Sequence, residues 1–176
     1  MAMIIGMDSW IIQDGNYSDF RVGEIREFAL EFYPISLGNI ESKNAITPQK
    51  GDLYEINGKV DYVDNDSWVI DFGLKAFQES SPPEGIKIGD KVSGVFYLGV
   101  DPFFYFERLK DKDGFPDITY KWQIEKIEME TTPFIETAPR TFERDKTKES
   151  YIEITETNAW EDFEGSACYL LYCKKL

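Results

Sequence analysis

The chain has 176 residues, of which 42% are hydrophobic and 15% aromatic, and its formal net charge is −14 at pH 7. This composition excludes an intrinsically disordered chain, and the length suits a single domain that folds without a metal or a disulfide. Acidic residues outnumber basic ones in every quarter of the chain. Because phosphates repel such a surface, we expect no nucleic-acid partner and no membrane partner.

The first part of the chain predicts one long strand. The N-terminal residues MAMIIGMDSW have no basic segment before their short apolar run, so we expect no secretory signal. In residues 20–33, Phe28, Leu30 and Phe32 alternate as in a strand, but the apolar residues from Ile25 onward also fit helical spacing. The aromatic density favours the strand, and a helix remains the alternative.

Residues 53–74 predict a β-hairpin. Two runs of alternating apolar residues are separated by the turn residues Asp-Asn-Asp at 64–66. The expected inward-facing side chains are Tyr54, Ile56, Val60 and Tyr62 in the first run, and Trp68, Ile70, Phe72 and Leu74 in the second. The following GLKAFQE (73–79) predicts a single helical turn, and the Ser/Pro-rich residues 79–85 predict a loop.

The stretch GIKIGDKVSGVFYLGVDPFFYF (85–106) predicts a strand that leads into an aromatic run. After a turn at Gly89 and Asp90, the side chains of Val92, Phe96 and Leu98 should face the core. Pro102 has no amide hydrogen to donate, so strand pairing should stop there. If the four rings at 103–106 continue as a strand, one alternating pair should be buried and the other covered by the C-terminal segment or exposed.

The last third of the chain predicts three further segments. Residues 118–130 form a strand in which the apolar phase slips at Ile127, as a β-bulge would cause. Residues 131–150 are irregular and should cross the surface, and residues 151–176 should form a C-terminal β-hairpin.

Together these elements resemble an OB-like or related small Greek-key β-barrel. The resemblance covers residues 20–130 and rests on the long first strand, the hairpin NGKVDYVDNDSWVIDFG, the strand GIKIGDKVSGVFYLG and the later KWQIEKIE. It implies an all-β fold and no particular site. We expect a single domain, residues 1–176, with a barrel core at about 18–130 and an extra C-terminal hairpin.

The residues missing from the chain exclude several chemistries. It contains no histidine, which removes the Ser–His and Cys–His nucleophile systems and imidazole metal ligation. It has no phosphate-binding P-loop and no Gly-x-Ser-x-Gly motif. The acids around Gly114 do not fit a calcium loop, because Leu109 and Tyr120 fall where oxygen ligands are needed. We therefore expect no cofactor and no metal.

The two cysteines predict a reducing compartment. Cys168 and Cys173 lie five residues apart in a strand-like run, so they point to opposite faces and cannot easily form a disulfide. We expect both to be small, largely buried residues in a cytoplasmic protein.

These observations favour a non-enzymatic cytosolic protein that binds another protein. An acidic surface and an aromatic patch would engage a partner with a basic site, as an inhibitor or immunity-type protein does with a basic toxin or nuclease. The candidate interaction surface comprises Tyr97, Asp101, Phe103, Phe104, Tyr105 and Phe106.

Two other functions remain open. A small ligand or carbohydrate could bind at a barrel mouth lined by Trp68, Tyr97 or Trp122. A carboxylate-based hydrolase is the further alternative, with Asp71 and Asp101 as candidate acids.

Overall fold

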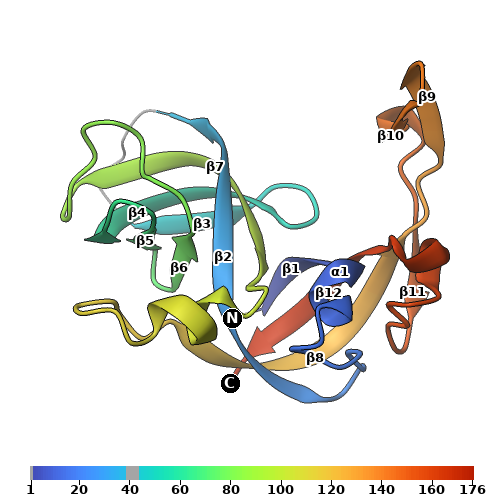
Figure 1. Cartoon of the computed structure of the whole chain (residues 1–176), viewed down its shortest axis with the longest axis horizontal. Coiled ribbons are helices and arrows are strands. Elements are labelled where there is room, and N and C mark those ends of the chain that lie inside the picture. The colour runs from blue at the N-terminus through green and yellow to red at the C-terminus, as the bar shows by residue number, and fades with distance from the viewer. Residues whose placement is uncertain (1, 39–43) are drawn as a thin grey trace.

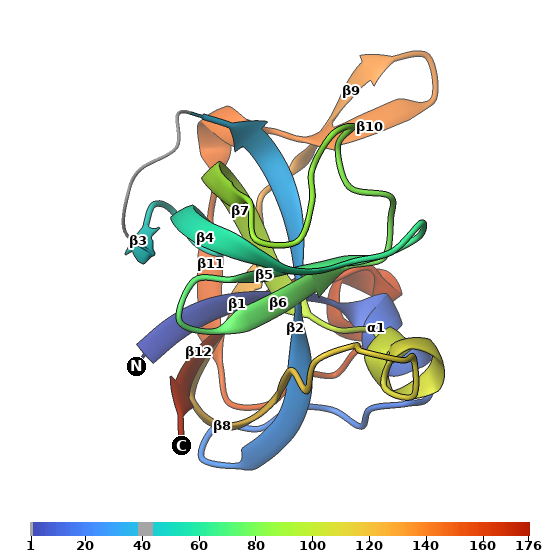
Figure 2. The same ribbon diagram turned by 90° about the vertical axis from the view of Figure 1, so that its left-hand side faces the viewer.

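The computed structural model describes residues 2–38 and 44–176, and these form a mainly β protein without a long helix. A ten-stranded mixed sheet closes on itself through eight strands without becoming a regular barrel, and a two-stranded hairpin projects from it (Figures 1 and 2). None of the described helices is long and apolar enough to cross a membrane.

The main sheet consists of β1 (Ala2–Asp8), β2 (Ile25–Leu37), β3 (Ala45–Pro48), β4 (Leu53–Val63), β5 (Trp68–Asp71), β6 (Lys75–Gln78), β7 (Lys91–Val100), β8 (Thr119–Glu130), β11 (Tyr151–Ile154) and β12 (Cys168–Lys175). The projecting hairpin consists of β9 (Phe134–Ala138) and β10 (Thr141–Arg144). The helical elements are short: α1 (Ser9–Gln13), the π-helical turn η1 (Tyr105–Leu109), and the 3₁₀ turns η2 (Lys146–Lys148) and η3 (Asp162–Gly165).

The strand pairings form two closed circuits that share β2 and β7. One circuit runs β2–β7–β4–β5–β6 and the other runs β2–β7–β1–β12–β8. Each circuit contains one parallel contact, β2 with β6 and β1 with β7, and each of these rests on a single residue pair. The single-pair contacts explain why the sheet closes without the even ladder of a regular barrel.

Several predictions from the sequence are confirmed. The segment that fitted both helix and strand is the strand β2, and Phe28, Leu30 and Phe32 are buried. The predicted hairpin is β4–β5, closed by a turn in which the Asp64 amide donates to the Ser67 carbonyl at 2.8 Å. Strand β7 buries the three predicted side chains at 92, 96 and 98 and ends at Val100, before Pro102.

The helical turn predicted at 73–79 is wrong, because these residues form β6 instead. Ala76 and Phe77 are fully buried, and β6 pairs with β5 on one side and touches β2 on the other. Partners distant in sequence therefore override the weak local helix preference.

The strand predicted for the aromatic run at 103–106 is also wrong. Phe103 has a positive φ of 83°, and the chain then turns into η1. Asp101 stabilises this start, because its carboxylate accepts hydrogen bonds from the amides of Phe104 and Tyr105 at 2.9 and 3.1 Å. A carboxylate that accepts hydrogen bonds from the unpaired amides at the start of a helical turn favours the turn over a strand.

The C-terminal hairpin predicted at 151–176 does not form. Strands β11 and β12 lie on opposite sides of β8, so each pairs with β8 and not with the other. The register of β8 against β12 skips Glu125, which confirms the slip predicted before Ile127. Residues 131–150 are not irregular throughout, since they contain the β9–β10 hairpin and the turn η2.

The core fills both circuits with aromatic and aliphatic side chains. Phe32 lies edge-on to Trp68 and Phe96, with ring centroids 4.8 and 5.7 Å apart, and Phe28 stacks on Trp122 at 5.8 Å. Strand β1, which had no predicted role, buries Met3, Ile5 and Met7. The N-terminal strand therefore belongs to the same core as the predicted barrel strands.

Candidate functional site

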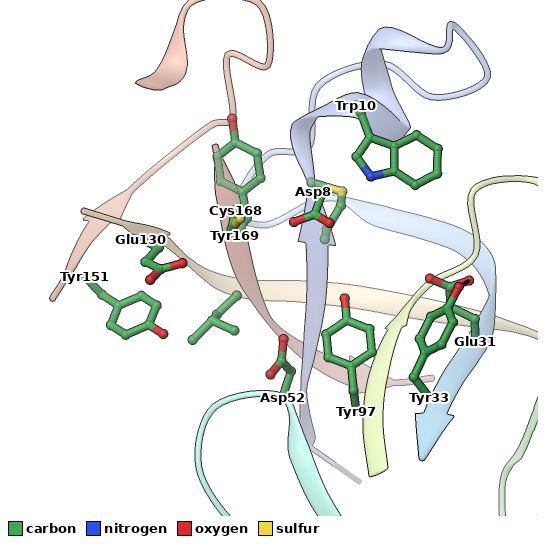
Figure 3. A pocket seen from close by; sticks show the side chains of 12 residues that line it. Asp8, Trp10, Glu31, Tyr33, Asp52, Tyr97, Glu130, Tyr151, Cys168 and Tyr169 are labelled. Atoms are coloured by element: carbon green, nitrogen blue, oxygen red, sulfur yellow. Dashed lines mark hydrogen bonds between the residues drawn. The ribbon is translucent and has the colours of Figure 1, made fainter. Parts of the chain in front are cut away.

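A pocket of about 480 Å³ opens where β7 changes its neighbour. Up to Tyr97, β7 pairs with the start of β4, and at Gly99 it pairs with β1 instead. Between these two strand partners, the Leu98 amide donates to the carbonyl of Asp52, in the turn before β4, at 3.0 Å. The end of β8 at Glu130 and the start of β12 at Cys168, Tyr169 and Leu170 form further walls of the pocket (Figure 3).

Four carboxylates from four different parts of the chain line this pocket. Asp8 ends β1, Glu31 lies in β2, Asp52 lies in the turn before β4, and Glu130 ends β8. None of the described residues that line the pocket is a lysine or arginine. Arg144 approaches from outside the lining, with its Nε 3.8 Å from Glu130 Oε2. The pocket therefore concentrates negative charge that a bound cation could neutralise.

Tyr97 stands in the middle of the carboxylates because two glycines make room for it. Gly6 and Gly99 are paired, and a Cβ on Gly99 would come within 2.6 Å of the Tyr97 ring. A side chain on Gly6 would collide with Tyr97 Oη and with Asp52 Oδ2, so both oxygens lie over Gly6. Figure 3 shows the hydroxyl pointing into the pocket, below Asp8 and between Asp52 and Glu31.

Two of the carboxyls hold their protons more tightly than ordinary acids. Burial, aided by the charge of Asp101, raises the pKa of Glu31 to about 8. Burial also raises the pKa of Asp52 to about 6, with Asp8 and Glu130 acting in the same direction. At neutral pH, Glu31 is therefore mainly a neutral acid and Asp52 mainly an anion.

Asp8 and Cys168 form a further pair in the pocket. They lie opposite each other in the β1–β12 ladder. Burial, with the charge of Asp8, raises the pKa of the thiol to about 12. A thiol that stays protonated is a poor nucleophile, so Cys168 is not suited to covalent catalysis. Both cysteines are free, as predicted.

Aromatic side chains form the remaining walls. The Tyr33 ring lies 6.0 Å from the Tyr97 ring, and its hydroxyl donates to Glu31 at 3.3 Å. Trp10, on α1, is 45% exposed and stands at the rim (Figure 3). Tyr151 lies on the opposite side and donates to Glu149 at 2.9 Å. These faces can contact the apolar part of a ligand or its positive charge.

The carboxylates do not converge as a metal site does. Within residues 2–38 and 44–176, no group of three or more Cys, Asp or Glu side chains is arranged to hold a metal ion. A Ca²⁺ or Mg²⁺ ion would need several oxygen ligands at short distances.

Of the six residues predicted as an interaction surface, one lines the pocket, namely Tyr97. Asp101 is fully buried beneath η1, and burial raises its pKa to about 7. Tyr105 is buried in a second small cluster with Phe77, Leu109 and Ile118. The prediction that one alternating pair of these rings is buried was therefore wrong, because Tyr105 alone of the four rings is fully enclosed.

The other three rings of the run are half-buried. Phe103 lies edge-on to Tyr17, with centroids 5.6 Å apart, and 4.8 Å from the Phe106 ring. Arg108 covers the Phe104 ring, with its guanidinium carbon 4.1 Å from the centroid. Cover by the C-terminal segment was one of the two predicted alternatives, and the ring contacts found among the described residues include those with Tyr17, Tyr105 and Arg108 and those between the rings themselves. Whether they contact a partner stays a prediction.

The remaining sequence candidates lie away from the pocket. Trp68 and Trp122 are fully buried in the core, so they cannot line a ligand site as suggested. Asp71 is half-buried and accepts a hydrogen bond from the Gly73 amide at 2.8 Å in the turn after β5. Sequence reasoning missed all four acids of the pocket, including Glu31. Asp8 and Glu130 end their strands and Asp52 lies in the turn before β4, where no periodic pattern marks a residue.

The arrangement provides anionic oxygens, a neutral phenol and aromatic walls at one opening of the surface. These groups are suited to binding a positively charged organic group. Comparison with models of known families, with curated proteins and with solved structures found no significant match.

Proposed function

We propose that this chain is a non-enzymatic cytosolic protein that binds a basic partner protein through its acidic surface. The observation that carries the proposal is the pocket lined by Asp8, Glu31, Asp52 and Glu130, with no lysine or arginine among its described lining residues. A basic side chain of the partner would enter it. The net charge of −14 would accelerate the encounter.

The aromatic contribution to binding comes from the pocket in this proposal. Tyr33, Tyr97 and Trp10 stand beside the carboxylates, whereas the rings at 103–106 contact one another and neighbouring side chains. The two free cysteines support a reducing, cytoplasmic location. An inhibitor or immunity-type role, covering a basic toxin or nuclease, is the specific form that we favour.

We also propose that the circuit β2–β7–β4–β5–β6 is an OB-like Greek-key unit. Five strands in a closed circuit, a consecutive run β4–β5–β6 and non-consecutive partners support this class. The second circuit, with β1, β8 and β12, would be an addition to that unit.

The test is binding of a labelled peptide of alternating lysine, arginine and serine, followed by fluorescence anisotropy. We expect binding that weakens as NaCl rises from about 50 mM to about 300 mM, and no binding of a matched glutamate–serine peptide. The double variant Asp8→Asn/Asp52→Asn should lose most of the affinity.

The matched control is Asp111→Asn/Asp113→Asn, which removes the same charge from an exposed turn. It should weaken binding much less than the pocket variant. Equal losses would mean that diffuse charge, and not the pocket, holds the peptide. Absence of binding at low salt would contradict the proposal.

A second candidate function is a carboxylate-based hydrolase, which one observation favours. Glu31 and Asp52 share the pocket, and their pKa values are raised to about 8 and about 6. A protonated acid near an ionised carboxylate is the arrangement that glycoside hydrolysis uses. Release of nitrophenol from a panel of nitrophenyl glycosides, abolished in Glu31→Gln, would support this candidate over the first.

A further inference from the structure

We propose that the pocket binds one alkyl ammonium group, from a lysine side chain or from a free amine, in preference to a guanidinium group. The inference rests on the proposed function and specifies the ligand class of the same site. It follows from the positions of the oxygens around Tyr97 and from the burial of Glu31. It also follows from the carboxylates of Glu31 and Glu130, neither of which offers both oxygens side by side to a guanidinium.

Two oxygens from separate segments of the chain lie over the same residue of the pocket floor. Asp52 Oδ2 and Tyr97 Oη both lie over Gly6, although Asp52 precedes β4 and Tyr97 belongs to β7. The facing glycines of β1 and β7 bring these atoms together, because a side chain at either position would displace the Tyr97 ring. No described residue hydrogen-bonds the Tyr97 hydroxyl, so its lone pairs remain available to a ligand.

Glu31 gives a second, independent indication of a ligand. Its side chain lines the pocket although the residue is only 7% exposed. Among the described residues its one hydrogen-bond partner is the Tyr33 hydroxyl, at 3.3 Å, so one carboxyl oxygen has no protein partner. This oxygen can accept a hydrogen bond from a ligand that enters the pocket.

Single oxygens from separate residues match an ammonium better than a guanidinium. An ammonium is compact and has three donors that diverge, so it can contact Asp52, Tyr97 and a third acceptor at once. A guanidinium is planar and binds best when one carboxylate presents both oxygens side by side. One Glu31 oxygen already accepts from Tyr33, and Glu130 has Arg144 beside it, so neither presents a free pair of oxygens.

The aromatic walls suit the carbon chain of such a ligand. The rings of Tyr33 and Tyr97 lie 6.0 Å apart, and Trp10 stands at the rim. The methylene groups of a lysine side chain or of butylamine can lie along these rings while the charge reaches the oxygens. The ring faces add an attraction for the positive charge itself.

The test is isothermal titration of the full chain with four small probes. These are Nα-acetyl-lysine methylamide, its Nε-acetylated form, Nα-acetyl-arginine methylamide and n-butylamine. We expect the lysine compound and butylamine to bind, the arginine compound to bind about fivefold more weakly or worse, and the neutral acetylated form not to bind.

Two pocket variants and one control assign the binding to these atoms. Tyr97→Phe removes only the hydroxyl and Asp52→Asn removes the anion, and each should weaken the ammonium probes about tenfold, as loss of a hydrogen bond to a charged group does. Asp111→Asn removes the same charge from an exposed turn and should leave affinity unchanged within twofold. Thermal melts of each variant establish that it is folded.

The outcomes separate this inference from the proposed function. Equal or tighter binding of the arginine compound overturns the preference for ammonium. It does not contradict the proposed function, which is binding of a basic partner protein. Binding of butylamine without binding of any lysine compound or basic peptide supports the ammonium site and overturns the protein-partner function. No binding of either ammonium probe, or no effect of Tyr97→Phe and Asp52→Asn, overturns the inference.

Discussion

Residues that are adjacent in the sequence of this protein can differ strongly in the exposure of their side chains. Tyr105 and Phe106 are adjacent aromatics, yet Tyr105 is 2% exposed and Phe106 is half-buried. The Tyr105 hydroxyl also donates to Asp117 at 3.4 Å. Because η1 is helical, successive side chains are rotated around its axis and do not alternate between two faces. The identity of a residue in an aromatic run therefore says little about its exposure.

Tyr105→Ala should cost about 3–5 kcal/mol of the free energy of unfolding, because it leaves a cavity beside Phe77 and Ile118. Phe142→Ala should change it by less than about 0.5 kcal/mol, since this ring on β10 is 61% exposed. Urea denaturation of both variants provides the measurement. Similar values for the two would contradict the burial of Tyr105.

Buried carboxyls make stability depend on pH at the residue scale. The pKa values of Glu31, Asp101 and Asp52 are raised to about 8, 7 and 6. The folded protein therefore holds protons that the unfolded chain releases above its ordinary carboxyl pKa values. The free energy of unfolding must then fall as pH rises from about 4.5 to about 8.

We expect the thermal midpoint to be several degrees higher at about pH 5.5 than at about pH 8.5. Glu31→Gln should reduce this difference and raise the midpoint at the higher pH, because the amide stays neutral. The matched control is Glu27→Gln, which removes an exposed acid from the same strand. If the two variants shift the midpoint alike, the effect comes from net charge and not from the burial of Glu31.

At the scale of elements, β8 has three strand neighbours. It pairs with β2, β11 and β12, and Ile127 is paired with Leu171 on one side and with Ile154 on the other. Strand β11 lies at one edge of the sheet and is largely exposed. The two strands should therefore differ in what a large-to-small substitution costs.

Ile127→Ala should lower the free energy of unfolding by about 2–5 kcal/mol, because this side chain is fully buried. Ile152→Ala makes the same chemical change on β11, where the residue is 47% exposed, and should cost less than about 1 kcal/mol. Guanidinium melts of the pair give both values. A smaller loss at 127 than at 152 would contradict the placement of β8.

Local patterns predicted those elements whose partners are nearby in the chain. Alternating apolar residues and an Asp/Asn turn were enough to predict the β4–β5 hairpin. The turn at Gly89 and Asp90 was enough to predict the start of β7. The pairing of β11 and β12 could not be predicted in this way. Both have strand-like patterns, but their shared partner β8 lies at residues 119–130, and periodicity does not identify partners at that distance.

The candidate site was even less accessible to sequence reasoning. Tyr97 was singled out, but the acids around it come from residues 8, 31, 52 and 130 and meet only after both circuits close. Among 33 acidic residues, nothing local distinguishes these four. The paired glycines at 6 and 99 are a usable signal in hindsight, since glycine inside a strand often marks a close approach.

At the scale of the whole molecule, charge governs which partners can approach. Several basic side chains in the described part of the chain are paired with carboxylates: Lys112 contacts Asp64 and Asp66, and Lys126 contacts Glu128 at 2.6 Å. A nucleic acid would have to displace these partners as well as overcome the acidic surface. The proposed OB-like character of one circuit therefore does not imply a nucleic-acid function.

Mixed-sequence single-stranded DNA or RNA should bind more weakly than about 10⁻⁴ M at physiological salt, the weak end of ordinary non-specific affinity. The physical reason is that binding gains free energy when Lys and Arg replace counterions at the phosphates, and a surface with a net charge of −14 has few free cations to offer. Fluorescence anisotropy with a labelled oligonucleotide measures this, and the basic peptide used for the pocket is the positive control. Because the two probes carry opposite charge, lowering the salt should strengthen the peptide signal and leave the oligonucleotide unbound. Micromolar binding of the oligonucleotide would contradict the prediction and would require a local basic groove on this surface.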